Sequence, residues 1–182
     1  MKKVELRKIY KQKRKELTGD EIANFQKEIY KEVFEYDFST IQNIHIFLPI
    51  EKQIEIDTYP IINFLREHQK TIVVSKSCFK TATLQHFVFD ENTELAINSY
   101  GIPEPINAVG ISPQEIDLVF VPLLISDQRK YRVGYGKGFY DRFLASCKPT
   151  VKTLGINFFK PISKIIDVDT FDFPLDEVIY PK

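Results

Sequence analysis

The chain has 182 residues, of which 43% are hydrophobic and 27% are charged, and its 25 Lys and Arg residues balance 25 Asp and Glu residues. This length fits a single domain with a true hydrophobic core, and zero formal net charge argues against binding nucleic acid by bulk electrostatic attraction. The sequence has no signal peptide and no apolar run of the ~18 residues that span a membrane, and two cysteines are too few for a disulfide framework or a zinc site. We therefore expect a soluble, monomeric, cytoplasmic protein that binds neither nucleic acid nor membrane.

The N-terminal half of the chain predicts alternating helices and strands. Residues 2–17 combine many Lys and Arg residues with a few apolar ones, which indicates a first helix. The stretch "TGDE" that follows is typical of a capping box, in which Thr18 caps a second helix and Glu21 reaches back to it. After it we expect, in chain order, a strand at 44–50, a helix at 58–70 with Asp57 as its N-cap and Pro60 in its first turn, a strand at 71–75 and an edge strand at 84–89.

The strongest strand in the sequence is "IDLVFVPLLIS", residues 116–126, which is apolar on both faces. Such runs are typical of strands in sheets that are covered on both sides. A loop at 100–105 precedes it, and a helix at 139–147 and strands at 151–158 and 176–181 follow. Because strands that alternate with helices form parallel sheets, we predict a single α/β domain over residues 1–182. We expect a three-layer sandwich with a mostly parallel sheet flanked by helices.

The segment "RKYRVGYGKGFYDRFL" places Gly134, Gly136 and Gly138 at every second position between a strand and a helix. Glycines let main-chain N–H groups approach a ligand closely, and such groups at a helix start favour anions. Arg132 and Lys137 add charged donors. The segment therefore predicts a polyphosphate site at the carboxyl end of the sheet, where the ligands of open parallel sheets bind.

Two features of this segment leave alternatives open. Its pattern G-x-G-x-G is neither a dinucleotide fingerprint nor a Walker loop, so it could also be a tight turn with a solvated basic surface. Asp141 lies one helical turn after Lys137. The Asp141 carboxylate could hold Mg²⁺ against phosphate oxygens, or it could form an ion pair with Lys137.

The same segment closely resembles the signature of the 5-formyltetrahydrofolate cyclo-ligase family, whose members are also called methenyltetrahydrofolate synthetases. The chain departs from the family pattern at Lys130, where a glycine is common, and at Lys76, where "SKS" replaces a Pro-Arg pair. The roles of Lys76 and Glu104 stay open. Weaker matches extend the resemblance in family order over nearly the full chain, at "KKVELR", "FLPIEKQIEIDTYPII", "YGIPEP" and "FDFPLDEVIYP".

The resemblance implies a single-domain α/β enzyme that uses ATP and Mg²⁺ to convert 5-formyltetrahydrofolate into 5,10-methenyltetrahydrofolate, ADP and phosphate. It implies that the formyl oxygen attacks the γ-phosphate, and that a folate nitrogen then closes the ring as phosphate departs. By motif position it also assigns site residues. These are Arg132, Lys137 and Tyr140 for catalysis, Ile50, Glu55 and Tyr140 for the folate, Asp141 and Asp172 for Mg²⁺, and Lys3, Arg7, Arg132, Val133, Gly134, Tyr135, Gly136, Lys137, Gly138, Phe139 and Tyr140 for ATP.

Three other functions fit parts of the sequence. A nucleotide- or phosphate-sensing domain would need Arg132 and the glycines but neither Asp141 nor Glu55. A sugar-phosphate isomerase or acyl-CoA transferase on a related scaffold would need a catalytic carboxylate and no ATP hydrolysis. The basic N-terminus could bind nucleic acid, although zero net charge and the lack of an aromatic RNA-binding motif speak against it.

Overall fold

The computed structural model describes all 182 residues, which form a central six-stranded sheet with the strand order β10-β9-β6-β1-β2-β3. Neighbouring strands run parallel except β2 and β3, which pair antiparallel at one edge. This confirms the prediction of a mostly parallel sheet with an edge strand near residues 84–89. The strands of the sheet are β1 (Asn43–His45), β2 (Thr71–Cys78), β3 (Thr83–Val88), β6 (Leu118–Pro122), β9 (Lys152–Ile156) and β10 (Glu177–Ile179).

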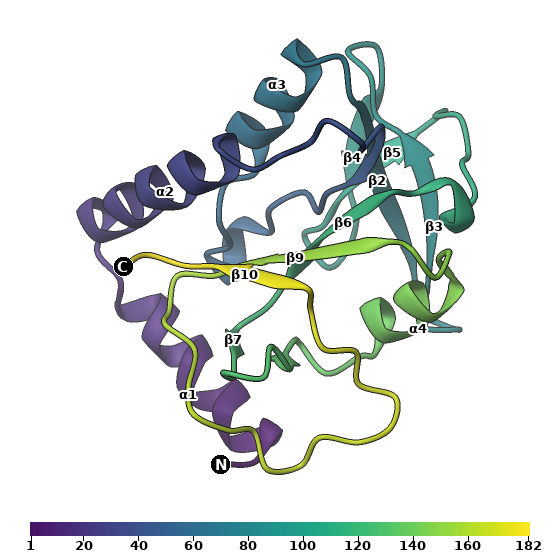
Figure 1. Ribbon diagram of the computed structural model, residues 1–182. Helices are drawn as coiled ribbons and strands as arrows, with labels where there is room; N and C mark the ends of the chain where they lie inside the picture. Colours follow the sequence, from purple (N-terminus) through teal and green to yellow (C-terminus); the bar gives the residue numbers. More distant parts are fainter.

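Helices cover both faces of the sheet and complete the three predicted layers (Figure 1). α2 (Gly19–Phe34) and α3 (Tyr59–Glu67) pack on one face, and α4 (Phe139–Ser146) packs on the other. Two short 3₁₀ turns, Glu51–Gln53 and Pro113–Glu115, lie in connections. None of the helices combines the length and the apolar character that crossing a membrane requires.

Side chains along the buried strands alternate between the two faces of the sheet. In β6, Leu118 and Phe120 join the core under α2 and α3, whereas Val119 and Val121 join the core under α4. A strand that is buried on both faces has no polar side, which explains why this part of the sequence is a continuous apolar run. The same alternation in β1 places His45 on the α4 side, where its ring packs against Phe143.

The prediction of one strand over residues 116–126 is wrong in its second half. β6 ends at Pro122, and the chain leaves the sheet to form a separate antiparallel hairpin of β7 and β8. Proline has no N–H group to donate to a ladder, which favours a strand end at this point. The glycine turn is therefore reached through this hairpin, which carries it beyond the carboxyl end of β6. The bounds of the hairpin strands are Ile125–Ser126 for β7 and Arg132–Val133 for β8.

The first helix, α1 (Lys3–Glu16), packs on this hairpin instead of on the sheet. Its buried side chains Leu6 and Tyr10 contact Ile125 and Val133 of the hairpin cluster. Most of the other residues of α1 are charged and face solvent or the glycine turn. The position of α1 therefore supports the glycine turn from outside the sheet.

A second hairpin was not expected from the sequence. Residues Pro103–Ile106 form β5, which pairs antiparallel with β4 (Glu94–Ile97), so the loop predicted at 100–105 is wrong in part. The two prolines of β5 suggested a loop, but proline is tolerated in a strand that has an unpaired edge.

The predicted helix caps are confirmed in one case and wrong in the other. Thr18 and Glu21 form the expected capping box at the start of α2. The N-cap of α3 is Thr58 instead of Asp57. The Asp57 carboxylate, one residue before this N-cap, still accepts a hydrogen bond from the Tyr59 N–H at 3.0 Å and so satisfies a free N–H group at the start of α3.

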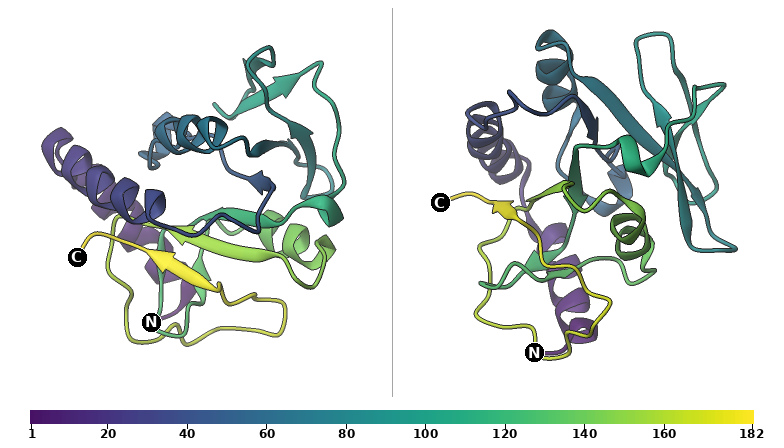
Figure 2. Two further views of the ribbon diagram at one scale, coloured as in Figure 1. Left: turned by 45° about the horizontal axis from the view of Figure 1, so that its top comes forward. Right: turned by 45° about the vertical axis from the view of Figure 1, so that its right-hand side comes forward.

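The long connection from β9 to β10, residues 157–176, runs past the N-terminus of α1 (Figure 2). The main-chain N–H of Ile166 donates to the carbonyl of Met1 at 3.2 Å, and the N–H of Lys3 donates to Asp167 Oδ1 at 2.7 Å. The first residues of the chain are thus attached to a segment that follows them by 164 positions.

Gly155 in β9 provides a test of how tightly the side chains of Leu175 and Leu123 pack on the sheet. A Cβ atom at this position would lie 2.6 Å from Leu175 Cδ1 and 3.0 Å from Leu123 Cδ2. We predict that Gly155→Ala lowers the free energy of unfolding by about 1–3 kcal/mol, because an added methyl group forces packed side chains to shift. Urea unfolding measures the change. Gly19→Ala is the matched control, because a Cβ there meets nothing within 4 Å; equal unfolding midpoints for the two variants would contradict the prediction.

Candidate functional site

A cavity of about 690 Å³ opens at the carboxyl ends of β1, β2 and β6. Its walls come from α1, the glycine turn, the start of α4 and the connection 157–176. Among the predicted site residues, only Val133 does not line this cavity, because its side chain is fully buried in the hairpin core. The predicted residues that line it are Lys3, Arg7, Ile50, Glu55, Arg132, Gly134, Tyr135, Gly136, Lys137, Gly138, Phe139, Tyr140, Asp141 and Asp172.

The glycine turn is shaped by its contact with Arg7 on α1. Arg7 Nε donates to the carbonyl of Gly134 at 2.8 Å. Gly136 has a φ of +90°, and a Cβ atom there would lie 3.0 Å from the Arg7 guanidinium carbon. Glycine thus permits both the backbone conformation and the close approach of Arg7. Between these contacts, the Lys137 side chain lines the cavity and forms no ion pair, so its charge is free to meet a ligand.

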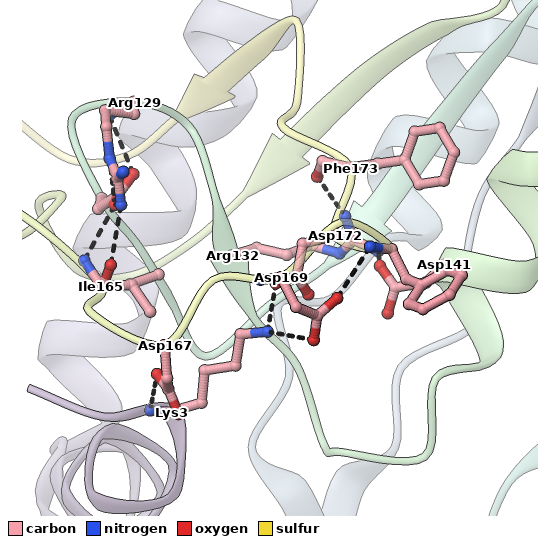
Figure 3. A network of polar contacts seen from close by, with 11 residues as sticks. Lys3, Arg129, Arg132, Asp141, Ile165, Asp167, Asp169, Asp172 and Phe173 are labelled. Carbon is pink, nitrogen blue, oxygen red and sulfur yellow. Dashed lines mark hydrogen bonds and ion pairs between the residues drawn. The ribbon is translucent and has the colours of Figure 1, made fainter.

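Two other cations of the cavity, Arg132 and Lys3, are paired with carboxylates (Figure 3). Arg132 Nη2 donates to Asp141 Oδ1 at 2.6 Å, and the Arg132 residue is only 9% exposed. Burial lowers the pKa of the Arg132 guanidinium, and the nearby Asp141 charge opposes that shift. Lys3 Nζ forms an ion pair with Asp172. Of the two alternatives for Asp141, an ion pair does form, but its partner is Arg132 and not Lys137.

The acidic residues of the cavity do not make a metal site by themselves. The structure contains no group of three or more His, Cys, Asp or Glu side chains that could hold a metal ion. Asp141 accepts hydrogen bonds through Oδ1 and Asp172 through Oδ2, which leaves the second oxygen of each carboxylate without a hydrogen-bond partner. Mg²⁺ commonly binds one or two carboxylates and completes its shell with water and phosphate oxygens. The donor set therefore fits Mg²⁺ that is bound together with a polyphosphate.

Glu55 is held by two hydrogen bonds at the wall of the cavity. The Tyr135 hydroxyl donates to Oε1 at 2.6 Å, and the main-chain N–H of Ile50 donates to Oε2 at 2.8 Å. Burial raises the pKa of the Glu55 carboxyl, and these two hydrogen bonds oppose the shift. Burial, followed by the Glu55 charge, also raises the pKa values of the Tyr135 and Tyr140 hydroxyls. Both tyrosines therefore stay neutral and can donate hydrogen bonds.

Arg14, which does not line the cavity but supports Tyr135 in its wall, was missed by sequence reasoning. It is only 3% exposed, and its guanidinium donates to the Tyr135 hydroxyl at 3.0 Å and to the carbonyl of Leu123. The signal available in the sequence was spacing, because Arg14 follows Arg7 by two helical turns and so faces the same side of α1.

A second missed feature is a buried row of polar side chains on three adjacent strands. His45 Nε2 lies 2.7 Å from Ser75 Oγ, and Ser75 Oγ lies 3.0 Å from His86 Nδ1. His45 is fully buried, and its Nδ1 has no hydrogen-bond partner. Burial, and then repulsion from His86, holds the pKa of His45 well below its usual range. Because a buried unpaired N–H is costlier than a bare ring nitrogen, the proton of His45 belongs on Nε2.

The two residues whose roles the sequence left open lie outside the cavity wall. Lys76 is exposed on β2 and does not line the cavity. Glu104 is buried on β5, where its carboxylate accepts a hydrogen bond from the Ser77 N–H at 2.8 Å. Glu104 therefore joins the β4-β5 hairpin to β2. The two cysteines, Cys78 and Cys147, are free thiols and half-buried.

Together these features define a class of α/β protein with a cavity lined by cationic side chains at the carboxyl edge of a mostly parallel sheet. The family model of the 5-formyltetrahydrofolate cyclo-ligase family matches residues 1–181. The chain therefore belongs to the 5-formyltetrahydrofolate cyclo-ligase family, which confirms the resemblance found in its sequence and makes it a member of a ligase family.

Relatives from a bacterium and from a mammal support this membership. The chain is 27% identical over 180 residues to the 5-formyltetrahydrofolate cyclo-ligase of Mycoplasma genitalium, a match that covers 96% of this chain and 94% of the relative. It is 28% identical over 156 residues to the mouse 5-formyltetrahydrofolate cyclo-ligase, with 79% and 75% of the two chains covered.

Solved structures confirm the fold. The 5,10-methenyltetrahydrofolate synthetase of Aquifex aeolicus superposes with a TM-score of 0.83 at 24% identity, over 99% of this chain and 90% of that one. The 5,10-methenyltetrahydrofolate synthetase of Mycoplasma pneumoniae gives a TM-score of 0.78 at 24% identity, over 98% of both chains. The six-stranded α/β architecture is therefore that of these synthetases.

The buried histidine row predicts a specific pH dependence of stability. Burial lowers the pKa of His86 from 6.5 to about 4. As the pH falls through this window, the unfolded chain gains a proton at His86 that the folded chain does not, so the folded state loses stability by up to about 3 kcal/mol. We predict that His86→Gln removes this loss, since glutamine stays neutral and can still hydrogen-bond to Ser75. Urea unfolding at pH 7 and pH 4.5 measures the fall in the free energy of unfolding for the wild-type protein and for His86→Gln. An equal fall in the two proteins would contradict the prediction.

Proposed function

We propose that this protein converts 5-formyltetrahydrofolate into 5,10-methenyltetrahydrofolate with ATP and Mg²⁺, releasing ADP and phosphate. The observation that carries the proposal is one cavity that contains both a cationic glycine turn and the fixed carboxylate of Glu55. The glycine turn suits a polyphosphate. The carboxylate suits the paired amino and ring N–H donors of a pterin, because its two oxygens can accept side by side.

In this proposal the phosphates bind between α1 and the glycine turn. Phosphoryl transfer needs mainly positioning and positive charge around the transferring group. Lys137 supplies an ammonium group that no carboxylate in the structure neutralises, and Arg7 and Arg132 supply guanidinium groups on either side of the turn. Mg²⁺ bound by Asp141 and Asp172 would neutralise further charge on the phosphate oxygens.

The folate would occupy the part of the cavity beside Glu55, Ile50 and Tyr140. Its formyl group is amide-like, so its carbon is a poor electrophile and its oxygen is a poor leaving group. Attack of the formyl oxygen on the γ-phosphorus forms a new O–P bond and breaks the bond to ADP. The second folate nitrogen then attacks the activated carbon and loses its proton, and the C–O bond breaks to release phosphate.

The direct test of the proposed function is the absorbance increase of 5,10-methenyltetrahydrofolate when the protein is mixed with 5-formyltetrahydrofolate, ATP and Mg²⁺. The increase should require all three components, and ADP and phosphate should appear in equal amounts. ATP binding without this turnover would favour a nucleotide-sensing domain instead.

The two parts of the cavity should respond differently to substitution. We predict that Lys137→Ala lowers kcat roughly 10²–10³-fold, because a preorganised charge that acts on the transferring phosphoryl group stabilises mainly the transition state. We predict that Glu55→Gln mainly raises the KM for the folate, because glutamine keeps one acceptor oxygen, toward Tyr135, but loses the charge and the second acceptor.

Steady-state titrations of each substrate with both variants measure this division. Gly19→Ala, which lies far from the cavity in α2, serves as the control. If Glu55→Gln impairs ATP and spares the folate, the assignment of Glu55 to the folate is wrong. If Lys137→Ala has wild-type kinetics, the glycine turn is a scaffold and not a phosphate site.

The role of Asp141 can be tested through the metal. We predict that Asp141→Asn raises the Mg²⁺ concentration for half-maximal activity by roughly tenfold or more, since the amide keeps an oxygen for Arg132 but has no negative charge for the ion. A Mg²⁺ titration at saturating ATP and folate measures the change. Asp20→Asn on the exposed start of α2 is the control. An unchanged Mg²⁺ titration for Asp141→Asn would remove Asp141 from the metal site.

A further inference from the structure

Tyr135 belongs to both parts of the cavity at once. Its backbone lies inside the glycine turn, between Gly134 and Gly136, while its hydroxyl group reaches Glu55 on the connection after β1. The oxygen-to-oxygen distance of 2.6 Å is typical of a hydroxyl that donates to a carboxylate, and such charge-assisted bonds are stronger than bonds between neutral groups. Tyr135 is therefore a direct physical link between the proposed phosphate and folate positions.

Arg14 fixes the direction of this link. An arginine guanidinium can only donate hydrogen bonds, so the Tyr135 hydroxyl oxygen must accept the 3.0 Å bond from Arg14 Nη1. The single hydroxyl proton of Tyr135 is then left to donate to Glu55. Arg14 is itself buried and anchored to the carbonyl of Leu123 at the end of β6. The three side chains thus form an ordered chain of donors that ends at the Glu55 carboxylate.

The link leaves Glu55 able to bind a ligand. Each carboxylate oxygen can accept about two hydrogen bonds, and each oxygen of Glu55 accepts one in the structure, from Tyr135 or from Ile50. One acceptor position per oxygen therefore remains for a pair of donors on a ligand. The effect of the Tyr135 bond is to hold the plane of the carboxylate in one orientation.

The position of Tyr135 is in turn controlled from the phosphate side. Arg7 donates to the carbonyl of Gly134 and packs against Gly136, so it contacts the residues on both sides of Tyr135. A polyphosphate that binds to Arg7 or to the N–H groups of the turn acts on the same few backbone atoms. If a bound phosphate orders or shifts these backbone atoms, the position of the Tyr135 hydroxyl changes with them, and so does its hydrogen bond to Glu55.

We propose that Tyr135 is a positioning residue that couples the two substrates: nucleotide bound at the glycine turn fixes the Tyr135 hydroxyl, which holds Glu55 in the orientation that the folate requires. This inference rests on the proposed function, because it needs both ligands to bind in one cavity. Coupling between ligands is reciprocal. The folate must therefore tighten nucleotide binding by the same factor as nucleotide tightens folate binding.

The test measures the affinity for each ligand with and without the other. For the wild-type protein, saturating non-hydrolysable ATP analogue with Mg²⁺ should lower the Kd of 5-formyltetrahydrofolate roughly tenfold, within the usual range of coupling between sites, and the reverse titration should give the same factor. Tyr135→Phe keeps the ring but loses the hydroxyl. In this variant each ligand should change the Kd of the other by less than twofold. Isothermal titration calorimetry provides all four Kd values for each protein.

Tyr131→Phe is the matched control, because the Tyr131 hydroxyl makes no hydrogen bond in the structure and its residue does not line the cavity. It should keep the wild-type coupling factor. Arg14→Lys is a second variant that keeps the charge but lacks the two-nitrogen fork with which Arg14 holds Tyr135 and Leu123, and it should lower the factor as Tyr135→Phe does. Thermal unfolding confirms that each variant is folded.

The outcomes separate this inference from the proposed function. A wild-type coupling factor of one, or an unchanged factor in Tyr135→Phe, overturns the positioning role even if turnover is normal. Equal weakening of both ligands with the factor preserved would show that Tyr135 only binds, and this also overturns it. If the wild-type protein binds neither ligand, the proposed function itself fails, and the inference fails with it.

Discussion

The site depends on keeping several cations together at one edge of a sheet before any ligand arrives. Lys3, Arg7, Arg132 and Lys137 line one cavity, and like charges this close repel one another in a partly buried place. The structure relieves the repulsion by pairing Arg132 with Asp141 and Lys3 with Asp172, and by turning Arg7 toward a carbonyl. Lys137 stays unpaired. The carboxylates are counter-ions for the folded protein alone, and under the proposed function they would also be oxygen ligands of Mg²⁺.

The two faces of the sheet serve different purposes. The face under α2 and α3 carries the larger core, a uniform set of aliphatic and aromatic side chains. The face under α4 carries a smaller apolar core together with the buried row of His45, Ser75 and His86, which lies beneath Tyr140. The face under α2 and α3 supports the strands through its larger core, and the face under α4 also supports the wall of the cavity. This division explains why the cavity lies on the side of α4, beyond the strand ends.

The sequence predicted the layers of this fold more reliably than the contacts of its site. Alternation and apolar runs identified the parallel strands, because burial on two faces is a strong constraint that acts on every residue of a strand. The β4-β5 hairpin and the break after Pro122 were missed, since both depend on where the backbone finds partners and not on side-chain pattern. The sixteen residues of the glycine segment sufficed to predict where the cavity lies. The hydrogen bonds from Tyr135 to Glu55 and from Arg14 to Tyr135 could not be predicted, because they join residues that are 80 and 121 positions apart in the chain and meet only through folding.

The attachment of the first residues to the connection 157–176 has a consequence for synthesis of the chain on the ribosome. α1 leaves the ribosome well before the residues that hold its start, such as Asp167, which follow 164 positions later. At roughly 5–20 residues per second, α1 waits roughly 10–30 s for its partners. A helix with so many Lys and Arg residues and so few apolar ones can wait in water without aggregating. The positive charge that suits α1 to the proposed phosphate site thus also keeps it soluble until the connection 157–176 has been synthesised.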